Sequence, residues 1–301
     1  MITINITGQI VLLFGCYLSL SPMNKLLLLF IILCCLCCYN LSAQNLELFD
    51  SSKKFNWEQV DSAPLDTPTL KSIFPVVVNK PFHDLKTLIN AIDLFHFIDL
   101  NKDGVNEIIY NGWTGGEGEM IHVLWENNQK FELKQTILGR IVELNPSSSK
   151  AKMTVLDYAC CAGYIDHLTY FELNGLVFQI TEDYAIPLYK LKDLNLIDPV
   201  QFEVQRDPYN FRLYIEIQQN LDPSDYPFDL IQNQNIAAIF STGDTGTALA
   251  EKTDETGRIW WLVVMNNAPK HPRTIFYRGN NGYEQYMPIG WMSSRYLKAK
   301  R

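Results

Sequence analysis

Residues 95–110 read FHFIDLNKDGVNEIIY, and this stretch indicates the fold of the central part of the chain. Its two ends, Phe95–Ile98 and Glu107–Tyr110, are rich in aromatic and β-branched residues, as strands are. The loop between them, Asp99–Glu107, has oxygen-bearing side chains at its first, third, fifth and ninth positions and Gly104 at its sixth. Glycine permits the backbone of a sharp turn. The stretch therefore predicts two strands joined by a loop that gathers oxygen atoms around one centre.

Oxygen ligands of this kind suit hard divalent cations, and Ca²⁺ takes several of them at once. The candidate ligands are the side chains of Asp99, Asn101, Asp103 and Glu107 and the backbone of Val105. An EF-hand is excluded, because its twelfth position needs a glutamate where this chain has Tyr110, and because both flanks are strand-like. The alternative is a turn rich in Asp and Asn that holds no metal. We expect a structural Ca²⁺ that staples a hairpin.

The loop resembles the calcium loop of FG-GAP and VCBS repeats, in which aromatic-x-Asp-x-Asn-x-Asp-Gly-x-x-acid-Ile lies between two strands. Phe97 and Ile108 stand at the flanking positions of that pattern. The chain shows one copy, whereas those families build propellers from several copies. The resemblance implies a calcium-stapled β unit and does not support a full propeller.

Strand-like segments continue to the end of the chain, separated by turns rich in Asn, Gly and Ser. They are 120–126, 131–143, 153–158, 167–173, 176–181, 201–204, 211–217, 236–240, 248–251, 259–265 and 286–292. Upstream, the prolines of 44–80 predict an extended lead-in with a strand at 76–78, and 82–92 has helical spacing with Asp84 as a candidate N-cap. The predicted fold class is all-β, mainly antiparallel, with a minor helix.

This pattern divides the chain into two expected β domains. The first, at 44–186, is expected to be a sheet or sandwich that contains the calcium-type loop, and a linker follows at 187–199. The second, at 200–299, is smaller. Many short strands with polar turns are typical of such antiparallel architectures.

The N-terminus has the layout of a secretory signal peptide. Met23–Lys25 is a short basic start, Leu26–Tyr39 is an unbroken apolar run, and Ala43 offers a small residue for cleavage. The run is shorter than the ~20 residues that a membrane-spanning helix needs. We expect export to the periplasm or the exterior, with 1–22 as an upstream extension. An uncleaved anchor made of both apolar runs is the alternative, although Ser21-Pro22 interrupts them.

The charge of the chain argues against nucleic-acid binding. The formal net charge is −8, and removing residues 1–43 takes away one lysine and no acids, which leaves 24 − 33 = −9. Proteins that bind nucleic acids need a basic footprint. We expect no nucleic-acid partner and no stable membrane span after cleavage.

Cys160 and Cys161 are the cysteines that remain after cleavage. In an oxidising compartment they are expected to form a vicinal disulfide, to pair between chains, or to stay buried and free. A vicinal bond is strained, because neighbouring Cα atoms lie ~3.8 Å apart and ordinary disulfides span ~4.4–6.8 Å. The sequence leaves these possibilities open.

The C-terminal region carries a second resemblance, on Asn210-Phe211-Arg212, Gly246–Leu249, Gly257–Val263 and Gly290–Leu297. These segments resemble the N-[LF]-R opening, the G-x-x-G-x-x-L strand, the G-R-x-W-W/Y-x-V strand and the closing G-W-[MV]-x-S-x-Y-L of bacterial Src-homology-3 (SH3b) domains. The resemblance implies a small SH3-like barrel that binds peptides or cell-wall material.

Large aromatic residues of this region serve either as core or as a binding surface. Asp254–Gly257 is predicted to be a hairpin turn. Alternation along the strand after Arg258 sends one of Trp260 and Trp261 inward, and Trp291 is expected in the core. The candidate groove residues are Trp260, Trp261, Tyr283, Tyr286, Trp291 and Tyr296.

The sequence shows no catalytic constellation, since its five histidines are scattered and its serines lack a nucleophile motif. We therefore predict an exported, non-enzymatic binding protein of the cell envelope with a structural calcium loop and an SH3-like module for a peptide, protein or cell-wall ligand. The alternative is an envelope hydrolase of glycans or peptidoglycan that the module targets. A purely structural or toxin-immunity-type partner protein is a third possibility.

Overall fold

The computed structural model describes residues 54–78, 82–116, 118–128, 130–158, 165–187, 194–215, 235–266, 271–272 and 286–300. The predicted signal peptide, Cys160, Cys161 and Tyr283 lie outside these ranges. All described residues belong to one compact unit, Ser42–Arg301. Within the described ranges, no helix has the length and apolar character needed to cross a membrane.

The predicted all-β fold class is confirmed, and the first sheet contains the calcium-type loop. It comprises β1 (Ser62–Pro64), β2 (Phe95–Ile98), β3 (Glu107–Trp113), β4 (Glu119–Asn127) and β5 (Lys130–Leu138), antiparallel and in chain order. Phe97 pairs with Ile108 and Ile98 with Glu107, so β2 and β3 bracket the loop in the predicted way.

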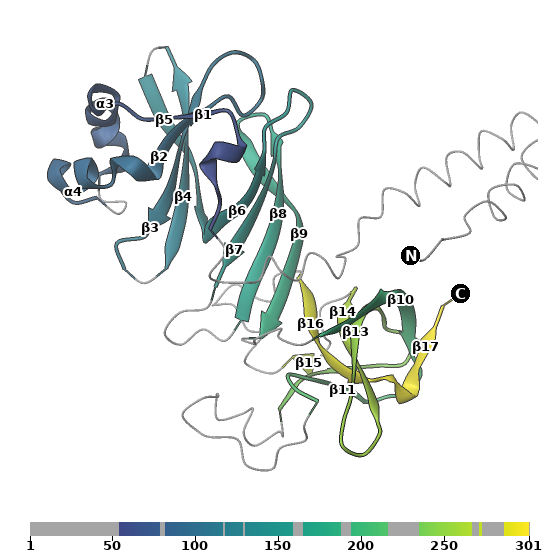
Figure 1. The fold of residues 1–301 in the computed structure, drawn as a ribbon. Coiled ribbons are helices and arrows are strands. Elements are labelled where there is room, and N and C mark those ends of the chain that lie inside the picture. Colours follow the sequence, from purple (N-terminus) through teal and green to yellow (C-terminus); the bar gives the residue numbers. More distant parts are fainter. Residues whose placement is uncertain are drawn as a thin grey trace, which may run out of the picture. The chain divides into compact units, whose positions relative to one another are not determined.

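Two helices cover one face of this sheet, α3 (Thr67–Val77) and α4 (Leu85–Asn90) (Figure 1). Asp84 caps α4 as predicted, its side chain accepting a hydrogen bond from the backbone N–H of Thr87. The extended lead-in expected at 44–80 is wrong for α3, and so is the strand expected at 76–78, because the helix continues to Val77. Asp66 caps this helix and Pro68 stands in its first turn, where a missing N–H costs nothing.

The apolar stripes of both helices pack on the sheet. Leu70, Ile73, Val77 and Leu88 share one core with Phe95, Ile108, Tyr110 and Leu124. Two short 3-10 helices, η2 (Trp57–Gln59) and η3 (Ile92–Leu94), flank these elements.

The second sheet starts where the chain turns at Gly139. The single strand expected at 131–143 is in fact two strands, β5 and β6 (Arg140–Asn145), and Gly139 between them has a φ of +101°. A side chain rarely tolerates this backbone conformation. From β6 the chain runs up and down through β7 (Lys152–Asp157), β8 (Ile165–Asn174) and β9 (Val177–Pro187).

The two sheets pack face to face, which confirms the sandwich-like expectation. A core of fully or nearly fully buried side chains lies between them. From the first sheet and its loops it takes Ile98, Leu100, Ile109, Ile121, Val123, Trp125 and Ile137, and from the second Ile141, Leu144, Met153, Val155, Phe171, Leu173 and Phe178. The first sheet therefore lies between a helical layer and the second sheet.

The C-terminal module, residues 195–299, wraps strands around a core of its own. Its strands are β10 (Asn195–Val204), β11 (Tyr209–Arg212), β12 (Ile236–Phe240), β13 (Thr245–Thr253), β14 (Ile259–Met265), β15 (His271–Pro272), β16 (Met287–Ser293) and β17 (Leu297–Ala299), with η6 (Ser294–Tyr296) before the last. The pairing order is β17-β10-β13-β14-β16, and β11 joins β16 to β12. Phe202, Phe211, Phe240, Val263 and Met292 centre the core.

The boundary between the two halves differs from the expected linker at 187–199. β9 extends to Pro187 and β10 begins at Asn195, so much of that segment is strand. A parallel pairing of Tyr184 and Ala185 on β9 with β16 continues the second sheet into the module. Parallel strands need a long connection, and β9 and β16 are far apart in sequence. Local sequence patterns therefore do not predict that these two strands pair.

Candidate functional site

The loop between β2 and β3 folds its carboxylates inward onto backbone amides. Asp99 accepts hydrogen bonds from the backbone N–H of Asp103 at 3.0 Å and of Gly104 at 2.9 Å. Asp103 accepts one from the N–H of Val105 at 2.8 Å, and the amide of Asn101 donates to the other oxygen of Asp103. Gly104, with a φ of +89°, supplies the turn. The structure thus brings together the acids and the amide that the sequence singled out.

Glu107 is the exceptional member of the loop, because it is 1 % exposed, while Asp99 is half-buried and Asp103 is exposed. One of its oxygens, Oε2, accepts a hydrogen bond from the backbone N–H of Leu100 at 2.8 Å. Burial, together with the smaller effect of the charges of Asp103 and Asp99, raises the pKa of Glu107 to about 7. No described basic side chain forms an ion pair with it.

A divalent cation fits this chemistry. It would relieve the repulsion between three carboxylates and would favour the charged form of Glu107. The described residues contain no cluster of three or more His, Cys, Asp or Glu with metal-ligand spacing. Asp99, Asp103 and Glu107 therefore do not form such a cluster by themselves, and Asn101 and the carbonyl of Val105 would have to complete the ligand set. Calcium binding therefore stays a prediction.

The raised pKa of Glu107 makes the stability of the metal-free protein, kept so by a chelator, depend on pH. The folded pKa of Glu107 is about 7 against an ordinary value of 4.5, so the folded state holds a proton that the unfolded state has lost between these pH values. Stability from this group is present below pH 4.5 and is lost as the pH rises to 7, by on the order of 3 kcal/mol. Urea unfolding of wild type and Glu107→Gln between pH 5 and 7 measures it. The wild type is expected to fall relative to the variant, and parallel curves would contradict this.

The structure confirms that Trp291 and one tryptophan of the pair, Trp260, belong to the core, and it corrects the groove expected at Tyr286. Trp260, Tyr286 and Trp291 are buried, with at most 9 % of the side chain exposed. Trp261 and Tyr296 are half-buried and pack against the module core, and Trp261 lies 6.1 Å from Phe202 between ring centroids. Among the described residues of the predicted set, Trp260, Tyr286 and Trp291 fill the interior, and Trp261 and Tyr296 keep part of their side chains exposed.

The buried Trp260 is held by the β13–β14 turn that the sequence predicted at 254–257. Asp254 accepts hydrogen bonds from Thr256, from the backbone N–H of Arg258 and, at 2.9 Å, from the Nε1–H of Trp260. These bonds lower the pKa of the Asp254 carboxyl, the Thr256 hydroxyl first. One carboxylate thus connects the turn to the indole.

Replacing Asp254 with alanine is expected to lower the melting temperature by several degrees, because it leaves the buried indole N–H of Trp260 without its acceptor. Glu255→Ala removes the same charge from the exposed side of the same turn and serves as the matched control. Thermal unfolding followed by Trp fluorescence measures both. Equal melting temperatures for the two variants would contradict this role of Asp254.

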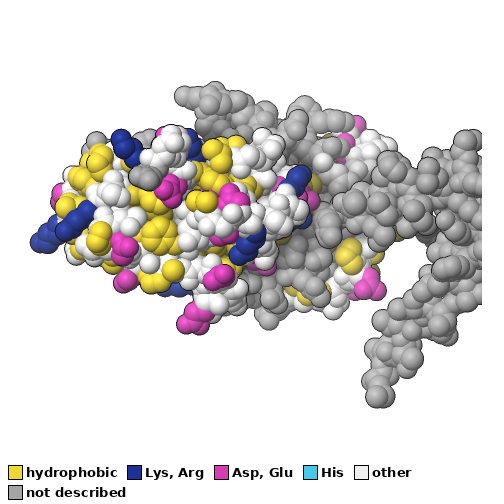
Figure 2. All heavy atoms as spheres, turned by 90° about the horizontal axis from the view of Figure 1, so that it is seen from above, with side chains coloured by type: hydrophobic (Ala, Val, Ile, Leu, Met, Phe, Trp, Pro, Cys, Tyr) yellow, Lys and Arg dark blue, Asp and Glu magenta, His cyan; other side chains and the backbone are white. Residues whose placement is uncertain are grey.

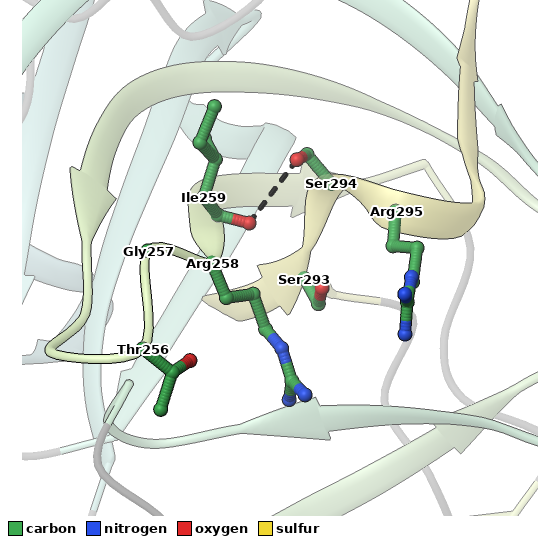
Figure 3. A pocket seen from close by; sticks show the side chains of 7 residues that line it. All are labelled: Thr256, Gly257, Arg258, Ile259, Ser293, Ser294 and Arg295. Atoms are coloured by element: carbon green, nitrogen blue, oxygen red, sulfur yellow. Dashed lines mark hydrogen bonds between the residues drawn. The ribbon is translucent and has the colours of Figure 1, made fainter.

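A pocket of about 360 Å³ opens beside this turn, between the β13–β14 turn and the β16–η6 corner. Its lining comprises Thr256, Gly257, Arg258, Ile259, Ser293, Ser294 and Arg295. Figure 3 shows the guanidinium ends of Arg258 and Arg295 extending to the same side, with Ser293 between them. Ser294 donates to the carbonyl of Ile259 at 3.1 Å and ties the two walls together.

Sequence reasoning missed this pocket, although the quoted SH3b-like motifs contain Arg258 and Ser293–Arg295. Those motifs were interpreted through their tryptophans. The signal lies in the register, since β14 pairs with β16 so that Trp260 stands opposite Ser293. This pairing brings residues that precede Trp260 next to those that follow Ser293.

A buried polar pair in the second sheet was also missed. His167 on β8 and Asp183 on β9 are 6 % and 7 % exposed, and their Nδ1 and Oδ1 atoms lie 3.2 Å apart. Thr169 donates to the same carboxylate oxygen, and the ring of Tyr286 stands edge-on to His167. The neighbouring strands β8 and β9 position all three polar groups.

The surface agrees with the mixed charge of the composition. On the face seen in Figure 2, Lys and Arg side chains are interspersed with Asp and Glu among hydrophobic patches.

No family model, no curated protein and no solved structure matches this chain.

Proposed function

We propose that this chain is an exported, non-enzymatic binding protein of the cell envelope. Its β2–β3 loop binds a structural Ca²⁺, and its C-terminal module recognises a peptide or cell-wall ligand. The observation that carries the proposal is the pocket beside Trp260, because its lining supplies guanidinium and hydroxyl groups. Such groups recognise anionic or polar ligands, and the lining lacks the carboxylates and histidines of acid–base catalysis.

Buried Glu107 supports the calcium part of the proposal. A carboxylate at 1 % exposure, with Asp99 and Asp103 acting on its pKa, is costly without a compensating cation. The loop belongs to a hairpin between two packed layers, so an ion there would hold Leu100 and its neighbours in the sandwich core. An ion in this loop would therefore hold β2 and β3 together.

One observation favours the hydrolase alternative. The His167–Asp183 pair has the orientation of a base and its supporting carboxylate. Thr169 donates its hydroxyl to Asp183 rather than to the imidazole, so the described groups form a structural triad with no nucleophile on His167. For this reason we place binding first.

Co-sedimentation with purified peptidoglycan sacculi tests both functions at once. The mature chain, residues 44–301, is incubated with sacculi in 1 mM Ca²⁺, and the supernatant is analysed by mass spectrometry. We expect the protein in the pellet and no released fragments. Soluble muropeptides that disappear with His167→Ala would establish the hydrolase instead, and protein that stays in the supernatant would overturn cell-wall binding.

A further inference from the structure

The pocket beside Trp260 concentrates positive charge on an acidic chain. Arg258 and Arg295 line it, both side chains are exposed, and neither forms an ion pair with a described acidic residue. The guanidinium of Arg258 lies 5.7 Å above the Trp260 ring, which holds it in place. None of the seven lining residues is acidic.

A third guanidinium adds to this potential from the interior. Arg212 on β11, which pairs with Trp291 of β16, is 7 % exposed. Burial lowers the pKa of Arg212, and the charge of Arg258 lowers it further. The two cations are thus close enough to repel each other, and an anion at the pocket would relieve that repulsion.

The three hydroxyl groups of the pocket differ in whether they already donate a hydrogen bond within the protein. Thr256 donates to Asp254, and Ser294 donates to Ile259. Ser293 is 9 % exposed, and its Oγ has no hydrogen-bond partner among the described residues. Most buried hydroxyls are paired, so an orphaned one beside two guanidinium groups indicates a missing acceptor.

We infer that this pocket binds a carboxylate group of a peptide, held by Arg258 and Arg295 with the Ser293 hydroxyl as a third donor. The planar fork of a guanidinium matches the two oxygens of a carboxylate. The open pocket admits either the C-terminal carboxylate or an acidic side chain of a peptide that lies across the β13–β14 turn. This inference deepens the proposed function by naming the ligand group.

Four probes distinguish the sources of the anion. They are acetyl-trialanine with a free C-terminal carboxylate, its C-terminal amide, acetyl-alanyl-glutamyl-alanine amide and inorganic phosphate. Binding to the mature chain is followed by NMR on the arginine Nε–H resonances. We expect the free acid or the glutamyl peptide to bind, at least tenfold more tightly than the amide. Binding of phosphate alone, or the absence of a carboxylate-bearing peptide that binds more tightly than the trialanine amide, would overturn the assignment.

Three variants test the named residues. Arg258→Gln and Arg295→Gln are each expected to weaken binding of the acid at least tenfold. Arg206→Gln is the matched control, because Arg206 lies 5.0 Å above Tyr296 and does not line the pocket. Unchanged affinity in both pocket variants, with the fold retained by circular dichroism, would overturn the inference.

Ser293→Ala separates a binding role from a structural one. The Ser293 Oγ has no hydrogen-bond partner among the described residues, so its removal is expected to leave the melting temperature unchanged or to raise it, while it weakens binding severalfold. A variant that is more stable and binds with full affinity would remove Ser293 from the site. If the arginine variants still sediment with sacculi, the pocket is not the cell-wall site, and the proposed function stands. If the wild type binds the carboxylate peptide but does not sediment with sacculi, the pocket inference stands and cell-wall binding fails.

Discussion

Saturating Ca²⁺ is expected to raise the free energy of unfolding of residues 44–301 by about 3 kcal/mol. A ligand that binds only the folded state at 100 times its Kd contributes roughly 2.7 kcal/mol. The loop Asp99–Glu107 exists in its folded form only when β2 and β3 pair, because Ile98 and Glu107 face each other at the base of the hairpin. Binding is therefore coupled to folding.

The variants of the loop sharpen this expectation. Asp103→Ala and Glu107→Gln are expected to abolish the calcium effect, and Glu126→Gln, an exposed change on β4, is expected to retain it. Urea unfolding in 1 mM Ca²⁺ or 1 mM chelator measures the difference, and calorimetry measures the heat of binding. In chelator at pH 7, Glu107→Gln is expected to be more stable than wild type, since it removes a buried charge. No heat and no stabilisation in wild type would remove the metal from this loop.

Gly139→Ala is expected to cost about 3–5 kcal/mol, the largest loss from any single change considered. Gly139 has a φ of +101°, and a Cβ there would lie 2.7 Å from the carbonyl oxygen of Leu156 and 2.8 Å from Val155. Strained backbone costs about 1–3 kcal/mol, and forcing an extra group into packed surroundings costs a similar amount. The backbone N–H of Gly139 also donates to Glu119, which limits how far the turn can shift.

The control for this change is Gly175→Ala in the β8–β9 turn. Gly175 has a φ of +63°, and a Cβ there meets nothing within 4 Å, so only the backbone term of roughly 1 kcal/mol remains. Urea unfolding compares the two variants with wild type. If Gly139→Ala is folded and no less stable than Gly175→Ala, the turn at Gly139 does not decide where the chain changes sheets.

The local elements were predictable because their signals are local. Alternation at 95–98 and 107–110, and the capping position of Asp84, depend on neighbours in sequence, and the structure has both. The prolines of α3 misled the prediction for the same reason. By local rules Pro68 interrupts a helix, whereas in the first helical turn it is compatible with the helix that Asp66 caps.

The roles of the aromatic residues were not predictable from the strand pattern alone. Alternation places Trp260 and Trp261 on opposite faces, but it does not say that both faces are covered. The pocket likewise depends on the register of β14 with β16. Because Trp260 pairs with Ser293, Arg258 and Ser293 line the same pocket although they are far apart in sequence. Contacts of this range carry no periodic signal.

The sequence by itself determined the β character, the hairpin around Asp99–Glu107 and the turn at Asp254, because strand alternation, oxygen spacing and glycine conformations act over a few residues. The tertiary structure alone decided that Glu107 is buried, that β9 pairs with β16, and that Arg258, Ser293 and Arg295 meet at one pocket. Burial and long-range pairing are properties of packed layers, and they set the charge environment on which the proposed binding depends.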